Sequence, residues 1–523
     1  MHPVIPPRMS VTDRLTTRAR PVAPEPAPPA GPPRWDHRLT YALLGLGALA
    51  VVAVFVVFQT YPNYDTYYSL VWGKELAGWQ LPDYDVLRTP TPHPLSTFTG
   101  WAMAPFGAAT DRILVLASLF GLLGFYVATF VFTERLLGRT IALIALAVML
   151  TRTDIQLLAL RATFDLPFYL MVFAAAVLEL RRPRCGWPVL ALLCLAGLLR
   201  PEAWLLAGVY WLWLAPAAPR RELIRLAPLV AAAPLIWLAG DLIVTGDPLY
   251  SLTSTRAIAG EFGRDRGLWD AIARIPEYSG GNESIVTLVA GGLGLLLALH
   301  LLRRRAALPL ALGGLGVATF LIFAAAGLSV IPRYMTIPSL LLSLCVAVAL
   351  GGWTLVEGRS ARRVAIAIAV VSLALVGWRA PWYYRDFSEL ADQASFVEAQ
   401  HEGLKGILDA PRVVPALHPA DFVGGHKQSC APITVPTHSA IPVIRYETGL
   451  PKEVLEASIA QRRPPDRGVL LIGRTFNFEP GTGRANTSKN PRASARKPWS
   501  NEPLPGFERI GRSGRWSAYA RCP

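Results

Sequence analysis

One carboxylate, Asp65, lies early in a stretch rich in tyrosine and tryptophan, TYPNYDTYYSLVWGKELAGWQLPDY (60–84). The stretch begins where the first long apolar run, 39–58, ends. A carboxylate in such a place can act as a general base toward a hydroxyl group, cap the N-terminus of a helix, or be a solvated loop acid. The residues around Asp65 and the elements that carry it must decide between these alternatives.

The aromatic residues near Asp65 fit one face of a helix that lies at a membrane surface. On a helix over 63–79, the residues on or near this face are Tyr64, Tyr67, Tyr68, Val71, Trp72 and Trp79. Tyr and Trp prefer the headgroup level of a bilayer, so we expect this helix in the outer membrane–water interface. Asp65 would lie near its N-terminus, where the helix dipole favours a carboxylate. A second segment of interfacial character, 92–107, follows.

The composition indicates a membrane protein. Of the 523 residues, 52% are hydrophobic and 17% are charged, and the mean hydropathy is +0.36. Apolar runs of about 18–22 residues are long enough to cross a bilayer as helices. The net charge of +15 is mostly arginine in short clusters between these runs. Such clusters indicate membrane topology, so we expect no nucleic-acid partner.

The apolar runs predict an α-helical polytopic protein of about eleven transmembrane helices. If the N-terminal tail is cytoplasmic, every arginine cluster falls on the cytoplasmic side, as the positive-inside rule requires. Residues 1–38, rich in Pro, Ala and Arg, are then a disordered cytoplasmic tail, and 39–380 form the transmembrane domain of a multi-pass plasma-membrane protein. The predicted spans are 39–58, 113–133, 140–153, 156–178, 187–199, 203–217, 226–244, 285–302, 307–328, 334–356 and 364–378.

Residues 381–523 are expected to form a small extracytoplasmic α/β domain. The stretch 476–501 is expected to be a mobile loop within it. Cys430 and Cys522 could form a disulfide if this domain lies outside the cytosol, and the five cysteines show no metal-ligand spacing. The predicted strands are VVPAL (413–417), GVLLIG (468–473) and RWSAYARC (515–522), and the predicted helix is PKEVLEASIAQR (451–462).

The order of several short motifs resembles the GT-C class glycosyltransferases. The branch concerned contains the protein O-mannosyltransferases, the lipid A aminoarabinose transferases and related actinobacterial envelope enzymes. Asp65 follows the first span, Tyr68 comes shortly after it, and His93-Pro94-Leu95 follows in the same loop. GLLRPEAWLL (197–206) and IPRYMTIPSLLL (331–342) resemble two later motifs of the class, and the resemblance covers about 39–380.

The resemblance implies transfer of a sugar from a polyprenyl-phosphate donor to an envelope acceptor on the extracytoplasmic side. Mannose and arabinose are both plausible, and the acceptor can be a glycan, a lipid or a protein. Such a transfer needs a base for the acceptor hydroxyl and cations for the phosphate. We expect Asp65 to be the base, and a single displacement would invert the anomeric configuration. Many relatives have Asp-Glu where this chain has Asp65-Thr66, so a divalent metal is unsupported and no cofactor is certain.

Several arginines are candidates for phosphate contacts. Arg333 is the first of them, because an outward arginine at the start of an apolar span is costly without an anionic partner; the alternative is snorkelling to the headgroups. Arg200 interrupts an apolar stretch, and its alternative is an ion pair with Glu202 at a helix break. Arg161 and Asp165 are spaced for an internal i,i+4 ion pair. The other candidates for substrate binding are Arg88, His93, Tyr68, Tyr334 and Arg256.

Two other functions remain open for the sequence. A transporter or lipid flippase would be expected to show repeated halves and charges near the bilayer midplane, and no clear internal repeat is visible. A noncatalytic envelope scaffold would bind its partner through the C-terminal domain.

Overall fold

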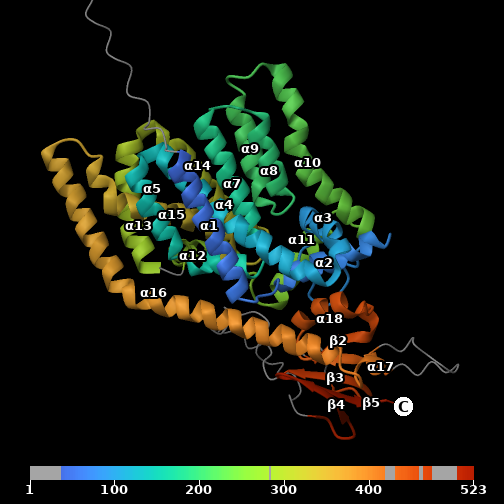
Figure 1. The fold of residues 1–523 in the computed structure, drawn as a ribbon. Helices are drawn as coiled ribbons and strands as arrows, with labels where there is room; N and C mark the ends of the chain where they lie inside the picture. Colours follow the sequence, from blue (N-terminus) through green and yellow to red (C-terminus); the bar gives the residue numbers. More distant parts are fainter. Residues whose placement is uncertain (1–36, 282–283, 418–429, 459–462, 474–502, 523) are drawn as a thin grey trace, which may run out of the picture. The chain divides into compact units, whose positions relative to one another are not determined.

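The computed structural model describes residues 37–281, 284–417, 430–458, 463–473 and 503–522 (Figure 1). The chain divides into two compact units, Met1–Gly47 and Ala48–Pro523, and the arrangement described below is that of the second. Most of the predicted tail 1–38 and the predicted loop 476–501 lie outside the described residues.

Helices make up most of the described chain, in keeping with the predicted fold class. In the described residues before α17 (Val414–Leu417), four 3-10 turns join or extend them: η2 (Ala104–Ala109), η4 (Arg303–Ala306), η5 (Pro332–Met335) and η6 (Gly352–Thr354). The helices before the C-terminal part are α1 (His37–Val57), α2 (Tyr64–Ala77), α3 (Pro94–Met103), α4 (Thr110–Leu137), α5 (Arg139–Leu150), α6 (Thr153–Leu160), α7 (Asp165–Arg181), α8 (Trp187–Gly197), α9 (Glu202–Leu214), α10 (Arg220–Thr245), α11 (Tyr250–Glu261), α12 (Gly267–Gly280), α13 (Ser284–Leu302), α14 (Ala307–Ala325), α15 (Thr336–Gly351) and α16 (Arg359–Leu408).

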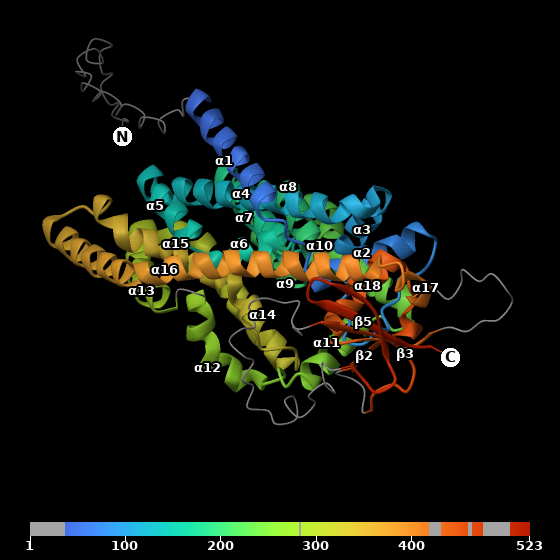
Figure 2. The same cartoon turned by 60° about the horizontal axis from the view of Figure 1, so that its bottom comes forward.

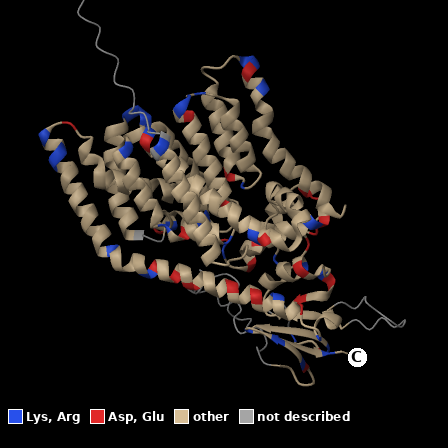
Figure 3. Cartoon of the chain, viewed as in Figure 1, with Lys and Arg blue, Asp and Glu red and all other residues tan. Residues whose placement is uncertain are grey.

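The long helices are those of a multi-pass membrane protein. Among the described residues, six helical stretches are long and apolar enough to cross a membrane, and a seventh is added if the bent pair α5 and α6 forms one span. Figure 3 shows long helices of the bundle almost bare of charge along their middles, with Lys and Arg at many of their ends, whereas the second half of α16 carries many charged residues. The number of about eleven spans, which includes shorter apolar helices, stays a prediction.

One predicted span is wrong. The run 156–178 is broken after α6, which ends at Leu160, and α7 begins at Asp165. The polar residues Arg161, Thr163 and Asp165 interrupt the apolar run here, and Ala162 has a positive φ of 47° that no helix accommodates. This break is bound to α2: the Asn63 N–H donates to the Arg161 carbonyl at 2.8 Å, and the Thr66 hydroxyl donates to the Ala162 carbonyl at 2.9 Å.

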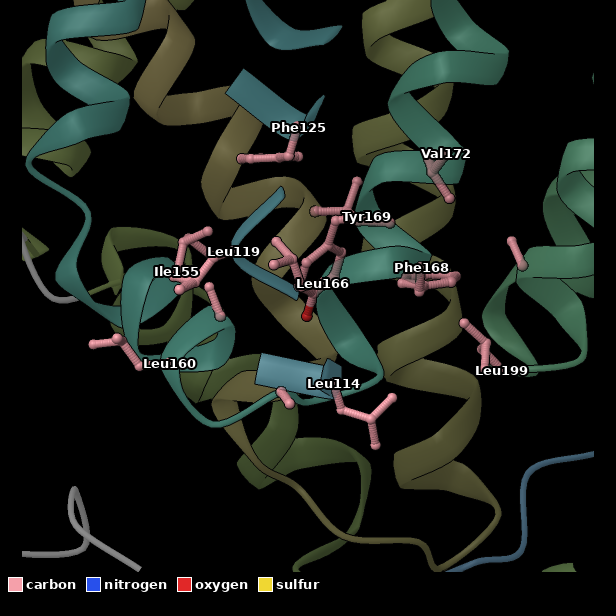
Figure 4. Packing of buried hydrophobic residues seen from close by; sticks show 14 of the residues in the cluster. Leu114, Leu119, Phe125, Ile155, Leu160, Leu166, Phe168, Tyr169, Val172 and Leu199 are labelled. Carbon is pink, nitrogen blue, oxygen red and sulfur yellow. The ribbon is translucent and has the colours of Figure 1, made fainter. Parts of the chain in front are cut away.

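Buried side chains of α4, α6 and α7 pack together beside this break. Figure 4 shows Phe125 of α4, Ile155 of α6 and Leu166 of α7 among these buried side chains. The Phe125 and Phe173 rings meet edge to face, with centroids 5.5 Å apart. Burial of large apolar side chains stabilises such a contact. The packing therefore fixes the N-terminal end of α7, where Asp165 lies.

The C-terminal part contains a five-stranded mixed sheet, so the predicted α/β architecture is confirmed. The strand order is β2-β1-β3-β5-β4, with β1 parallel to β2 and β3, and β5 antiparallel to β3 and β4. Its elements are α17 (Val414–Leu417), β1 (Ile433–Val435), η7 (His438–Ala440), α18 (Ile441–Thr448), η8 (Lys452–Val454), β2 (Leu455–Ala457), β3 (Gly468–Gly473), β4 (Glu508–Ser513) and β5 (Trp516–Arg521).

Two of the local predictions in this part hold and two are wrong. GVLLIG forms β3 and RWSAYARC contains β5, as predicted. VVPAL is instead helical, because the Val413 and Val414 N–H groups both donate to the Ala410 carbonyl and continue the turn that follows α16. The stretch predicted as a helix at 451–462 forms η8 and β2, because pairing with β1 extends the sheet; residues 459–462 lie outside the description. The disulfide between Cys430 and Cys522 is present.

Helix α16 belongs to both the bundle and the C-terminal part. It packs against α13 and α15 and, further along, against β4 and β5 (Figures 1 and 2). The Trp516 indole donates to the Gln400 carbonyl at 3.1 Å, and a side chain at Gly403 would lie only 3.0 Å from the same indole. The expected boundary at 380/381 falls within this continuous helix and stays a prediction.

Candidate active site

Helix α2 holds Asp65 in its first turn. Asn63 caps the helix, since its Oδ1 accepts a hydrogen bond of 3.0 Å from the Thr66 N–H. Gly73 and Gly100 let α2 and α3 approach closely, because a Cβ on Gly73 would collide with the backbone of Gly100. Asp65 is therefore held by a capped helix packed against its neighbour.

Arg333 connects Asp65 to Asp165. Its Nη1 lies 3.2 Å from Asp65 Oδ2, while its Nε and Nη2 lie 2.7 and 2.6 Å from the two oxygens of Asp165. Such a two-point arginine–carboxylate contact fixes the guanidinium plane. Oδ1 of Asp65 has no hydrogen-bond partner among the residues that the structure describes. It remains open to a ligand.

Arg200 extends this chain of charges. It pairs with Asp165 on one side and with Glu202 Oε1 on the other, at 2.9 Å from Nε and 2.5 Å from Nη2. The Arg200–Glu202 pair at a helix break, one of the alternatives drawn from the sequence, is thus present. The predicted Arg161–Asp165 pair is wrong, because the helix breaks between them and Asp165 instead bridges two arginines from distant segments.

A cavity of about 1000 Å³ is lined by Asp65, Arg333, Arg200 and Glu202. It is bordered by α2, the loop before α3, the starts of α9 and α11, the end of α10, α14, η5 and the segment around η7. Six of the candidates named from the sequence line it: Asp65, Arg88, His93, Arg200, Arg333 and Tyr334. The structure thus brings together residues that lie up to 269 positions apart in the chain.

Two candidates lie outside the cavity lining. Tyr68 is fully buried and packs on Trp72 and edge-on to Tyr64. Burial raises the pKa of its hydroxyl well above the usual value. Arg256 is exposed, and its side chain covers Gly327. Neither side chain lines the cavity.

One rim of the cavity is cationic. The guanidinium carbons of Arg88 and Arg264 each lie 4.7 Å from the centroid of the Phe262 ring. Arg88 pairs with the half-exposed Glu261 at 2.5 Å, whereas Arg264 has no carboxylate within 4.0 Å among the described residues. His438, from η7, lies beside Phe262 and Tyr64. Burial, with Arg88 nearby, lowers the pKa of His438 to about 4.

Sequence reasoning missed three lining residues: Arg264, His438 and Asp241. Arg264 lies in the second outward loop, where Arg256 was the residue named, and a loop gives no periodicity by which to choose between them. His438 comes from the C-terminal part, whose position against the cavity no local pattern reveals. Asp241 did carry a signal, since it is an ionisable residue inside an apolar run.

A second charged cluster lies on α2, where α16 and α18 contact it. The Tyr67 hydroxyl donates to Asp111 Oδ2 at 3.0 Å, and Lys405 Nζ lies 2.6 Å from the same oxygen and 2.9 Å from Glu447. The His401 ring stacks on Tyr61 with centroids 4.6 Å apart and is fully buried. None of these residues lines the cavity. Below we call Tyr67, Asp111, Lys405, Glu447 and His401 the junction cluster.

No group of three or more His, Cys, Asp or Glu side chains that could hold a metal ion occurs in the described ranges.

The fold is shared with a solved structure, that of ArnT. ArnT from Cupriavidus metallidurans bound to undecaprenyl phosphate aligns with 92% of this chain and 98% of its own, at 14% identity and a TM-score of 0.51. The apo state of the same protein aligns over the same shares at 16% identity and a TM-score of 0.48. No protein-family model and no curated protein sequence matches this chain. The chain therefore has an ArnT-like fold.

Proposed function

We propose that this protein transfers a sugar, mannose or arabinose, from a polyprenyl phosphate to an envelope acceptor. The main support is one observation: a carboxylate with an open oxygen, Asp65, faces a large cavity that also contains four arginines. The ArnT-like fold adds to it, since ArnT was crystallised with undecaprenyl phosphate. The donor would be a membrane lipid, and the acceptor a glycan, a lipid or a protein.

Asp65 is proposed as the general base. Its Oδ1 accepts the proton of the acceptor hydroxyl while the hydroxyl oxygen forms a bond to the anomeric carbon. The bond from that carbon to the phosphate oxygen breaks, and polyprenyl phosphate leaves with the electron pair. One displacement inverts the anomeric configuration. The proton can then pass from Asp65 to the released phosphate. Arg333, which is held by Asp165, orients the carboxylate through Oδ2.

The charges favour the cationic rim as the position of the donor phosphate. Arg333 and Arg200 share three carboxylates, so that group already carries more negative than positive charge. Arg264 lacks a carboxylate partner in the described chain, and Arg88 pairs with a half-exposed one. A phosphate gains most from cations that are not already neutralised. We therefore assign the phosphate to Arg264 and Arg88, and a supporting role to Arg200 and Arg333.

The proposed topology follows the positive-inside rule. The N-terminus lies in the cytoplasm, and Asp65, the cavity and the C-terminal α/β part lie on the extracytoplasmic side of the plasma membrane. The disulfide between Cys430 and Cys522 supports this side for the C-terminal part, because disulfides persist in oxidising compartments.

The test is Asp65→Asn, which keeps the size of the side chain and removes the base. With purified protein and a polyprenyl-phosphate sugar, transfer to acceptors in membranes of a deletion strain should fall about 10²- to 10⁴-fold. Binding of undecaprenyl phosphate should not change. Asp392→Asn, at an exposed acid of α16, is the matched control.

Transfer by Asp65→Asn at the wild-type rate would rule out the proposed mechanism. Lipid movement across vesicles without any transfer would indicate a flippase, and envelope defects without either activity would indicate a scaffold.

A further inference from the structure

The cavity contains a second carboxylate that the proposed chemistry does not use. Asp241 lies one turn before the end of α10 and is 3% exposed. Its Oδ2 accepts a 2.8 Å hydrogen bond from the Ser251 N–H, and its Oδ1 accepts one of 2.8 Å from the Ser251 hydroxyl. A carboxylate has about four acceptor positions, so about two remain. Within the described chain, no Lys, Arg or His lies within 4.0 Å of it.

The burial of the Asp241 carboxylate costs free energy unless a ligand binds its remaining acceptor positions. Burying a carboxylate without a cation is unfavourable, and an ionisable side chain within a membrane span is by default a functional candidate. Ser251 supplies two donors and is itself fixed by the Trp237 indole, which donates to its hydroxyl at 2.9 Å. The carboxylate is thus held by hydrogen bonds, and Asp241 lines the cavity. Whatever binds there must supply hydrogen-bond donors.

His93 lies in the same wall and has unused hydrogen-bonding capacity. Its ring meets Trp237 edge to face, with centroids 5.4 Å apart, and its buried Nδ1 has no partner among the described residues. Burial, with Arg333 and Arg200 nearby, lowers the pKa of His93 to about 3. The imidazole is therefore neutral near pH 7 and can both donate and accept. The Trp204 ring packs edge to face on Trp237, at 5.5 Å.

We propose that Asp241, His93 and Trp237 form the subsite that binds the transferred sugar of the lipid-linked donor. This inference rests on the proposed function. Two adjacent ring hydroxyls donate to Asp241, one of them accepts from or donates to His93, and the apolar face of the ring packs against the indole of Trp237. The carboxylate repels anionic groups, so the bound sugar offers hydroxyl donors and carries no negative charge.

Lipid binding tests this subsite without turnover. The probes for the full-length protein in nanodiscs are undecaprenyl phosphate and the same lipid carrying mannose or arabinose. The wild-type protein should bind at least one sugar-bearing lipid more tightly than undecaprenyl phosphate. Asp241→Asn should weaken that binding about 10- to 100-fold, because a hydroxyl loses a charged partner. The same variant should bind undecaprenyl phosphate as the wild type does.

Several results would overturn the subsite. These are equal weakening of all three lipids, no weakening at all, or a wild-type protein that does not distinguish sugar-bearing lipids from undecaprenyl phosphate. If Asp241→Asn does not fold, His93→Gln must show the same sugar-selective loss. Asp392→Asn is again the control.

The proposed function can fail separately from the subsite. Transfer by Asp65→Asn at the wild-type rate contradicts the function while leaving sugar recognition intact. Failure of the wild-type protein to bind any of the three lipids contradicts both.

Discussion

Two charged clusters contact the same short helix, α2, and they differ in their access to the cavity. On the cavity, Asp65 uses one oxygen for Arg333 and keeps the other open. In the junction cluster, Lys405 bridges Asp111 and Glu447, and Tyr67 donates to Asp111 as well. Similar residue types thus border a cavity in one place and form a buried contact between helices in the other. Access to a cavity distinguishes the two. A spare acceptor does not, because the buried Oδ1 of Asp111 also has no hydrogen-bond partner among the described residues.

The largest expected effect is a loss of stability on removing the carboxylate of Asp165, which removing that of Asp65 should not cause. Asp165 is 2% exposed and pairs with both Arg200 and Arg333. Asp165→Asn leaves two guanidiniums without their shared carboxylate, which should destabilise the protein by about 3–5 kcal/mol. We expect a clear fall in the melting temperature in detergent together with loss of transfer. Asp65→Asn should lose transfer alone. An unchanged melting temperature for Asp165→Asn would show that the two acids are equivalent.

In the junction cluster, a substitution should lower stability but leave transfer nearly unchanged, the reverse of what we expect for Asp65→Asn. Lys405→Met removes the cation next to Asp111, which is 1% exposed, and should destabilise the protein by up to about 3 kcal/mol. Because Lys405 does not line the cavity, transfer per folded molecule should stay within about twofold of the wild type. Lys405→Arg is the matched control, because it keeps the charge. Loss of transfer in a folded Lys405→Met protein would contradict a purely structural role.

A smaller effect is a loss of stability at low pH that comes from the buried His401. His401 is fully buried between Tyr61 and Tyr67, and burial, with Arg161 and Lys405 nearby, lowers its pKa well below the usual 6.5. The folded state keeps this ring neutral while the unfolded state takes up a proton. Its contribution to stability is therefore present above pH 6.5 and is lost as the pH falls below that value, by about 1.4 kcal/mol per unit.

The variant His401→Phe isolates this contribution. Phe keeps an aromatic ring against Tyr61 and cannot titrate. Melting temperatures measured from pH 7.5 to 5 should fall less steeply for His401→Phe than for the wild type, and His93 and His438 should account for part of the slope that remains. Parallel curves for the two proteins would mean that His401 does not contribute to the acid sensitivity.

The helical bundle could be predicted because long apolar runs in a sequence indicate membrane-spanning helices. Asp65 was also predictable, since it is an acid in an aromatic segment directly after a span. The break at Arg161–Phe164 was harder to foresee, because it depends on hydrogen bonds to Asn63 and Thr66 about 100 residues away.

The partners within the site could not be derived from local sequence. Arg333 and Asp165 meet only when η5 packs against the start of α7, and the i,i+4 spacing of Arg161 and Asp165 suggested a different pair. In the C-terminal part, a stretch with helical composition became β2 because β1 offered it a partner. Tertiary context decided both outcomes, and local propensity is too weak to oppose it.

The disulfide has a consequence for limited proteolysis. Cys430 precedes β1 and Cys522 follows β5, so the bridge encloses the whole sheet in one covalent ring. A single backbone cut between these cysteines opens the ring without separating the two pieces. A nicked protein therefore runs as one chain on a gel until reductant is added, and only then do the strands that follow the cut leave the membrane-anchored part.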